Sequence, residues 1–135
     1  MKKMMITFWA VLFISGCGFS SGMEGGSNGV YVHIKNNTDF NLYGLELNME
    51  TSSHMVINAN GTEVEKGESM VIELLKGDMS ASSSEQFELF IITNENGDKR
   101  LPVEHSYTID FNPGQSWYFE LKGNDVKDLA LYKER

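Results

Sequence analysis

The chain has 135 residues, of which 41% are hydrophobic and 22% are charged, with two prolines and one cysteine. This composition corresponds to one folded domain, and it excludes a chain that is disordered throughout and a barrel enzyme of ordinary size. A single cysteine excludes an internal disulfide and, with only three histidines, argues against a closed zinc site. The net charge of −8 argues against nucleic acid as a partner, because phosphate binding needs clustered Lys and Arg.

The first residues have the order of a secretory signal. Lys2 and Lys3 precede an apolar segment, residues 4–14, and the small residues Ser15 and Gly16 follow it. The apolar segment is too short for a membrane-spanning helix, which needs about 20 residues. Residues 1–16 are therefore expected to be a signal peptide.

The end of this segment reads Ile14-Ser15-Gly16-Cys17 and resembles the lipobox of bacterial lipoproteins, a resemblance confined to the first seventeen residues. It implies cleavage before Cys17 and attachment of diacylglyceryl and acyl chains to that residue, at the extracytoplasmic face of the cell membrane. Two or three such chains anchor a protein stably, whereas one does not. Cleavage removes two of the eleven basic residues and none of the nineteen acidic ones, which leaves a net charge of about −10. The anchor, and not attraction to anionic lipid, must then hold the protein at the membrane.

Residues 17–29 are rich in Gly and Ser and show no apolar period, which predicts a flexible tether behind the lipidated Cys17. Such a segment spans roughly 20 Å. The folded domain is expected over residues 30–135.

From Val30 the apolar residues recur with a period of two, which predicts β-strands separated by turns. Residues 36–39 form a turn cluster, and the apolar face changes parity at Gly44, as at a β-bulge. Residues 54–58 and 69–75 are further strands, and Asn60-Gly61 is a hairpin signal between them.

The second half of the domain continues this pattern after a polar interruption at residues 76–86. Residues 87–93 are apolar on both faces, which predicts a central strand covered on both sides. Asn96-Gly97 predicts a tight hairpin, residues 103–111 give the clearest half-buried strand, and Pro113-Gly114 predicts a type II turn. Further strands are expected over residues 117–121 and, in preference to a short helix, within residues 124–135.

Seven or eight short strands predict an all-β fold, an antiparallel β-sandwich of immunoglobulin-like size, with a small lipocalin-like barrel as the alternative. The opening of the domain, residues 32–38, and the later Gly67-Glu68-Ser69 resemble small β-sandwich modules of bacterial surface proteins.

No pattern in the chain predicts a catalytic, metal or cofactor site. His33 is expected to face solvent, His54 to begin a strand and His105 to point inward, and no two histidines are spaced for joint metal ligation. The oxygen-rich residues 94–98 lack the spacing of a calcium loop and fit a hairpin turn better. Paired carboxylates such as Glu104 are expected on a solvated strand face.

The sequence therefore favours a non-enzymatic, lipid-anchored cell-surface module that binds an envelope protein or peptide through a sheet edge or loops. One alternative is an immunity or inhibitor lipoprotein against a membrane-active peptide, which an acidic body would attract if the peptide is cationic. Another is a lipocalin-like carrier of a small apolar ligand. Tyr31, Tyr118 and Tyr132 are candidates for an outward-facing aromatic group, whereas Trp117 is expected to point inward.

Overall fold

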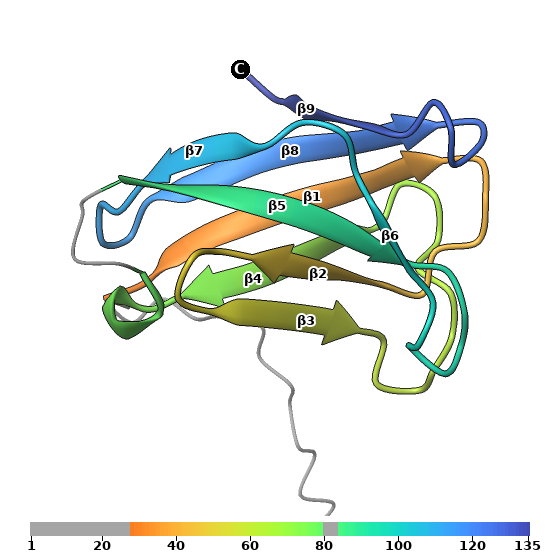
Figure 1. Ribbon diagram of the computed structural model, residues 1–135, viewed down its shortest axis with the longest axis horizontal. Coiled ribbons are helices and arrows are strands. Elements are labelled where there is room, and N and C mark those ends of the chain that lie inside the picture. Colours follow the sequence, from red (N-terminus) through yellow and green to blue (C-terminus); the bar gives the residue numbers. More distant parts are fainter. Residues whose placement is uncertain (1–27, 80–83) are drawn as a thin grey trace, which may run out of the picture.

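The computed structural model describes residues 28–79 and 84–135, which form nine strands in two packed sheets (Figure 1). The expected all-β sandwich is confirmed, and the sheets do not close into a barrel. The signal peptide, Cys17 and the tether up to residue 27 lie outside the described residues. Within the described ranges, no helix is long and apolar enough to cross a membrane.

The first sheet has four strands in the order β4-β1-β8-β9. They are β1 (Val30–Thr38), β4 (Ser69–Leu74), β8 (Ser116–Gly123) and β9 (Ala130–Lys133). Neighbouring strands are antiparallel except β1 and β8, which are parallel. A parallel pair needs a long connection between its two strands. Here that connection is residues 39–115, which contain all the strands of the second sheet as well as β4.

The second sheet has the order β3-β2-β5-β6, and β7 pairs with the first half of β5. Its strands are β2 (Gly44–Asn48), β3 (Ser53–Ile57), β5 (Ser84–Ile92), β6 (Arg100–Pro102) and β7 (Tyr107–Asp110). A single turn of 3-10 helix, η1 (Lys76–Asp78), lies between β4 and β5.

The core lies between the two sheets and is filled from both. The inward residues alternate along the strands, as in β4, where Met70, Ile72 and Leu74 are buried. At its centre the Phe119 ring meets Phe87 and Tyr107 edge-on, with ring centroids 5.6 and 5.1 Å apart. Burial of each large apolar side chain stabilises the fold by about 1.5–3 kcal/mol.

The turn expected at residues 36–39 is wrong, because β1 continues to Thr38. The side chains of Asn36 and Thr38 point inward and are almost fully buried. They satisfy their hydrogen bonds with one another and with nearby carbonyls, so two turn-favouring residues are kept in a strand.

The strand expected over residues 103–111 is confirmed only for β7, residues 107–110, because the chain breaks between β6 and β7. His105 stands in this break with φ of 82° and is exposed, so the expectation that it points inward is contradicted. A non-glycine residue with positive φ cannot continue a β-ladder. The alternation of apolar residues hides this break because Val103 and Ile109 are still buried on either side of it.

The turn signals have mixed outcomes. Asn96-Gly97 forms the expected hairpin between β5 and β6, and Pro113-Gly114 forms the type II turn, with φ of 80° at Gly114. Asn60-Gly61 does form a turn, but no hairpin follows, since β3 and β4 belong to different sheets. The final strand, β9, is confirmed.

The central position of β5 is confirmed, but the expectation that both its faces are covered is only partly correct. Ile92 is buried on the outer face, whereas Glu88 and Gln86 on that face are exposed. The shift of parity at Gly44 is confirmed, because Leu42 and Leu45 are both buried in the core.

Candidate functional site

The outer margin of the second sheet is the most exposed apolar feature of the described residues. It is formed by β3, which pairs with β2 and lies at the lower border of the molecule in Figure 1. Met55 and Ile57 are 53% and 54% exposed, although both lie on a β-strand. Their neighbours His54 and Val56 point to the opposite, inner side and are half-buried.

An ion pair lies next to these two apolar residues on the same face. Glu46 on β2 faces Met55 across the ladder, and its carboxylate oxygens lie 2.6 and 2.7 Å from Nη1 of Arg100 on β6. The Arg100 guanidinium also covers the Phe90 ring at 4.7 Å. Burial of Glu46 favours its neutral form, but the hydrogen bonds from Arg100 and Ser53 outweigh that effect and hold its pKa below the usual 4.5.

The position of β3 depends on the absence of a side chain at Gly44. A Cβ atom there would lie 2.5 Å from the Val56 carbonyl oxygen and 2.6 Å from Cγ2 of Ile57. Only glycine therefore allows β3 to approach β2 this closely at the end of the ladder.

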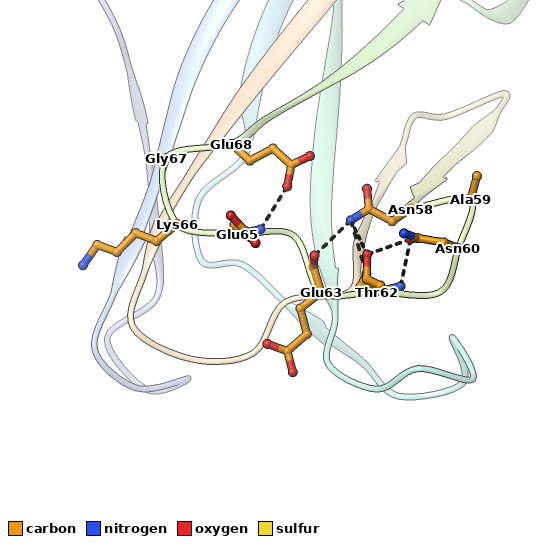
Figure 2. Close-up of a pocket in the computed structure, with 9 residues that line it drawn as sticks. All are labelled: Asn58, Ala59, Asn60, Thr62, Glu63, Glu65, Lys66, Gly67 and Glu68. Carbon is orange, nitrogen blue, oxygen red and sulfur yellow. Dashed lines mark hydrogen bonds between the residues drawn. The ribbon is translucent and has the colours of Figure 1, made fainter.

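An acidic loop follows β3 and surrounds an open hollow of about 820 Å³ (Figure 2). Its carboxylates are Glu63, Glu65 and Glu68, and Glu95 lies beside the same loop. Glu63 accepts a hydrogen bond from the Tyr43 hydroxyl at 3.1 Å, and this bond raises the pKa of Tyr43 above 10.0. The loop's amide side chains bond within the loop, since Nδ2 of Asn58 donates to the Glu63 carbonyl at 3.0 Å.

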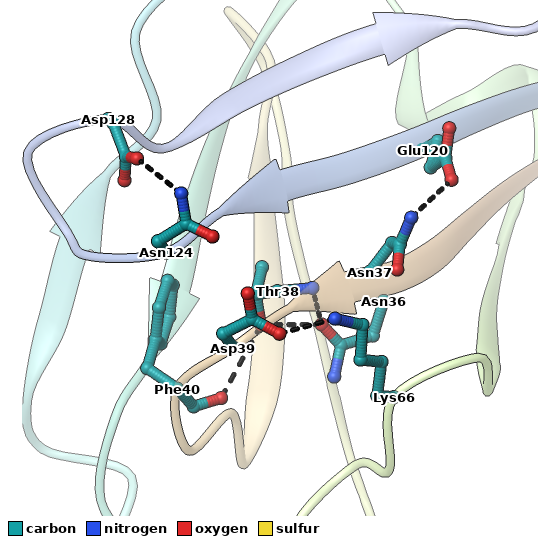
Figure 3. A network of polar contacts seen from close by, with 9 residues as sticks. All are labelled: Asn36, Asn37, Thr38, Asp39, Phe40, Lys66, Glu120, Asn124 and Asp128. Carbon is teal, nitrogen blue, oxygen red and sulfur yellow. Dashed lines mark hydrogen bonds and ion pairs between the residues drawn. The ribbon is translucent and has the colours of Figure 1, made fainter.

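A buried asparagine, Asn36, holds this loop against the first sheet. Figure 3 shows its bonds to Thr38 and the nearby pair of Lys66 with Asp39. Nδ2 of Asn36 donates to the Val64 carbonyl at 2.8 Å, and its Oδ1 accepts the Thr38 amide at 3.1 Å and the Thr38 hydroxyl at 2.7 Å. Lys66, the only basic residue of the loop, forms an ion pair with Asp39. The loop carboxylates therefore keep a surplus of negative charge.

A second acidic group lies at the other end of β3. A hollow beside the β2–β3 turn is lined by Glu50, Glu85 and Glu88. Glu85 is buried and accepts the Glu50 amide at 3.0 Å, which fixes the turn. Asp78 of η1 is nearby, because its carbonyl accepts the Ser52 hydroxyl at 2.6 Å. Strand β3 is therefore acidic at both ends.

The structure does not bring the three histidines together. His33 lies on the outer face of the first sheet, as expected, stacked on Tyr118 with centroids 4.6 Å apart, and burial lowers its pKa below 6.5. His54 is at the start of β3, 3.7 Å from an oxygen of Asp78. His105 is exposed in the break between β6 and β7. Across residues 28–79 and 84–135, no group of three His, Cys, Asp or Glu side chains is placed to hold a metal.

The three outward tyrosines do share one face, that of the first sheet, on the adjacent strands β1, β8 and β9. They do not present flat rings side by side, because Tyr118 stacks face-to-face on His33 and the Lys122 ammonium lies over Tyr132 at 5.4 Å. Trp117 is buried, as expected.

The residues of the β3 margin could not be singled out from sequence. Met55 and Ile57 alternate with a histidine and a valine, so both faces of that strand are partly apolar and the pattern does not show which one is covered. The one available signal was the absence of Asp, Glu, Lys and Arg from residues 53–58.

No family model matches the chain, and no curated protein matches it. Among solved structures, it is similar to a protein from Eubacterium rectale determined by NMR, with a TM-score of 0.47 and 13% identity over 84% of this chain and 96% of that one. It is also similar to a structure of disulfide-locked intermedilysin with human CD59, with a TM-score of 0.39 and 8% identity over 80% of this chain and 24% of that one. Neither likeness indicates what this chain binds.

Proposed function

We propose that this chain is a bacterial lipoprotein, anchored by lipid at the extracytoplasmic face of the cell membrane, that acts as a binding module and not as an enzyme. The observation that carries the proposal is Cys17, the single cysteine, placed directly after Ile14-Ser15-Gly16 at the end of a short apolar segment. A lone thiol at that position is suited to acylation, and acylation with two or three chains gives a stable anchor.

The folded domain supports the binding part of the proposal. Its interior is filled by apolar side chains from both sheets, which favours a solid module over a carrier with an internal ligand cavity. Its distinctive surface is an exposed apolar strand flanked by acidic loops. A tether between anchor and domain would leave that surface accessible close to the membrane.

The test is the partitioning of the full chain and its Cys17→Ser variant between membrane and soluble fractions of the expressing bacterium, with incorporation of a clickable fatty acid as a second measurement. The account predicts that only the unchanged chain is labelled and sediments with membranes. A matched control combines Cys17→Ser with Ser21→Cys, which keeps one thiol but moves it four residues beyond the lipobox. If this control or Cys17→Ser is labelled and membrane-bound like the original, the proposal is wrong.

A second candidate function is immunity against a cationic membrane-active peptide. The specific observation in its favour is the acidic loop, in which Glu63, Glu65 and Glu68 stand beside one paired lysine. Such a surface attracts cations and raises their local concentration near the membrane. A strain that lacks the gene should then become more sensitive to cationic peptides, and unchanged sensitivity would refute this candidate.

A further inference from the structure

The outer edge of β3 carries backbone groups that no described strand pairs with. Among the described strands β3 pairs only with β2, and the Met49 amide donates to the Ser52 carbonyl at 2.8 Å where the hairpin closes. Hydrogen-bonded and non-bonded pairs alternate along an antiparallel ladder. The N–H and C=O groups of Ser53, Met55 and Ile57 therefore point away from β2.

The other sheet edges are protected in ways that β3 is not. On the opposite side of the sandwich, the Tyr107 hydroxyl donates to the Leu131 carbonyl, and Glu104 bridges to Ala130, so β9 is tied to the second sheet. Strand β4 has a charged residue, Glu73, on its exposed face. Strand β3 has no Asp, Glu, Lys, Arg or Pro, and charge and proline are the usual devices that keep an edge unpaired.

The charges around β3 determine which occupant it suits. Glu63 and Glu95 lie beyond its Ile57 end, and Glu50 of the β2–β3 turn and Asp78, 3.7 Å from His54, lie at its Ser53 end. A second copy of this chain pairing edge to edge would bring carboxylates against carboxylates in either orientation. A segment that carries Lys or Arg would meet complementary charge at both ends and apolar side chains between them.

We propose that β3 accepts an extended basic segment of a partner polypeptide as an additional strand of the second sheet. The partner's backbone bonds to the outward groups of Met55 and Ile57, and its alternate apolar side chains cover these two residues on the outer face. Its basic side chains reach the acidic groups at the two ends. This inference rests on the proposed binding function and specifies its surface and the chemistry of its partner.

The experiment uses the full-length protein purified in detergent and a peptide of four Lys-Val repeats as the probe. Binding is measured by fluorescence anisotropy, and amide hydrogen exchange locates the contact. We expect saturable binding that protects the amides of Met55 and Ile57, weakens at least tenfold when NaCl is raised from about 50 to 500 mM, and is absent for four Glu-Val repeats.

Variants at the two edges separate strand addition from general charge attraction. Met55→Pro removes one outward N–H of β3 but leaves every hydrogen bond between β3 and β2 in place. It should therefore weaken binding of the Lys-Val peptide at least tenfold. Val71→Pro removes the equivalent outward N–H on β4 and should leave binding unchanged. Ile57→Lys keeps the backbone intact and adds a repelling charge, so it tests the surface if Met55→Pro does not fold.

Each of four results would overturn the inference. First, a peptide of four lysines followed by four valines could bind as tightly as the four Lys-Val repeats. Second, Met55→Pro and Ile57→Lys could both leave the affinity unchanged. Third, the protein could dimerise with rising concentration in sedimentation, with the dimer abolished by Ile57→Lys. Absence of any binding would overturn it as well. None of these results depends on the anchor, so the fate of the Cys17→Ser test and the fate of this one are distinguishable.

Discussion

Substitution of Gly44 by alanine tests the packing that places β3. The new Cβ would stand 2.5 Å from the Val56 carbonyl oxygen, well inside normal contact, and that oxygen belongs to the backbone and cannot rotate away. Either β3 moves outward or Gly44 moves into β5. Overpacking of this kind costs about 1–3 kcal/mol, and loss of one ladder hydrogen bond adds about 1 kcal/mol. We therefore expect Gly44→Ala to lower the free energy of unfolding by about 2–4 kcal/mol.

The assay is urea unfolding followed by fluorescence of Trp117, with two glycine controls. Gly77→Ala adds a methyl group with no atom within 4 Å and no unusual backbone angle, so it should stay within about 0.5 kcal/mol of the original. Gly67→Ala also meets no atom but has φ of 94°, so strain alone should cost about 1–2 kcal/mol. If Gly44→Ala is no more destabilised than Gly77→Ala, β3 does not approach Gly44 as described.

Three further perturbations test other parts of the structure. Asn36→Asp removes the buried amide donor and places a carboxylate against the Val64 carbonyl. It should lower the free energy of unfolding in urea at pH 7 by at least about 2 kcal/mol. An unchanged free energy of unfolding would show that Asn36 does not hold the loop. The pKa of Glu46 is lowered in the fold, so its pairing with Arg100 stabilises the protein above pH 4.5, and this stability is lost as pH falls through the lower folded pKa. The difference in free energy of unfolding between the original and Glu46→Gln should therefore shrink on acidification. A difference that stays constant with pH would refute the pairing. Tyr107→Phe removes the hydroxyl that donates to Leu131, and it should cost about 1 kcal/mol and raise amide exchange in β9, whereas unchanged exchange would show that this bond does not hold the strand.

The elements that sequence predicted well are those in which a local signal and the tertiary fold agree. Asn96-Gly97 forms a hairpin because the strands on both sides of it belong to one sheet. At Asn60-Gly61 the local turn also forms, but the next strand joins the other sheet, and no local signal encodes that choice. The parallel pairing of β1 with β8 has the same cause, since it joins residues far apart in the chain.

The candidate surface was less predictable for a different physical reason. Alternation shows which side chains share a face, but it does not show whether that face is covered. Asn36 was expected in a turn yet is buried in a strand, because the fold supplies partners for its side chain. Met55 lies on a strand with apolar residues on both faces, and 53% of it stays exposed because β3 is the last strand of its sheet among the described residues. Cys17 was predicted from sequence alone and lies outside the described residues.

The central claim is the lipid on Cys17, and its most direct measurement is the mass of the N-terminal tryptic peptide of protein extracted from bacterial membranes. The account predicts a peptide of residues 17–35 that begins at Cys17 and carries a thioether-linked diacylglyceryl group. A peptide that begins before Cys17, or an unmodified thiol at that residue in membrane-derived protein, would contradict it.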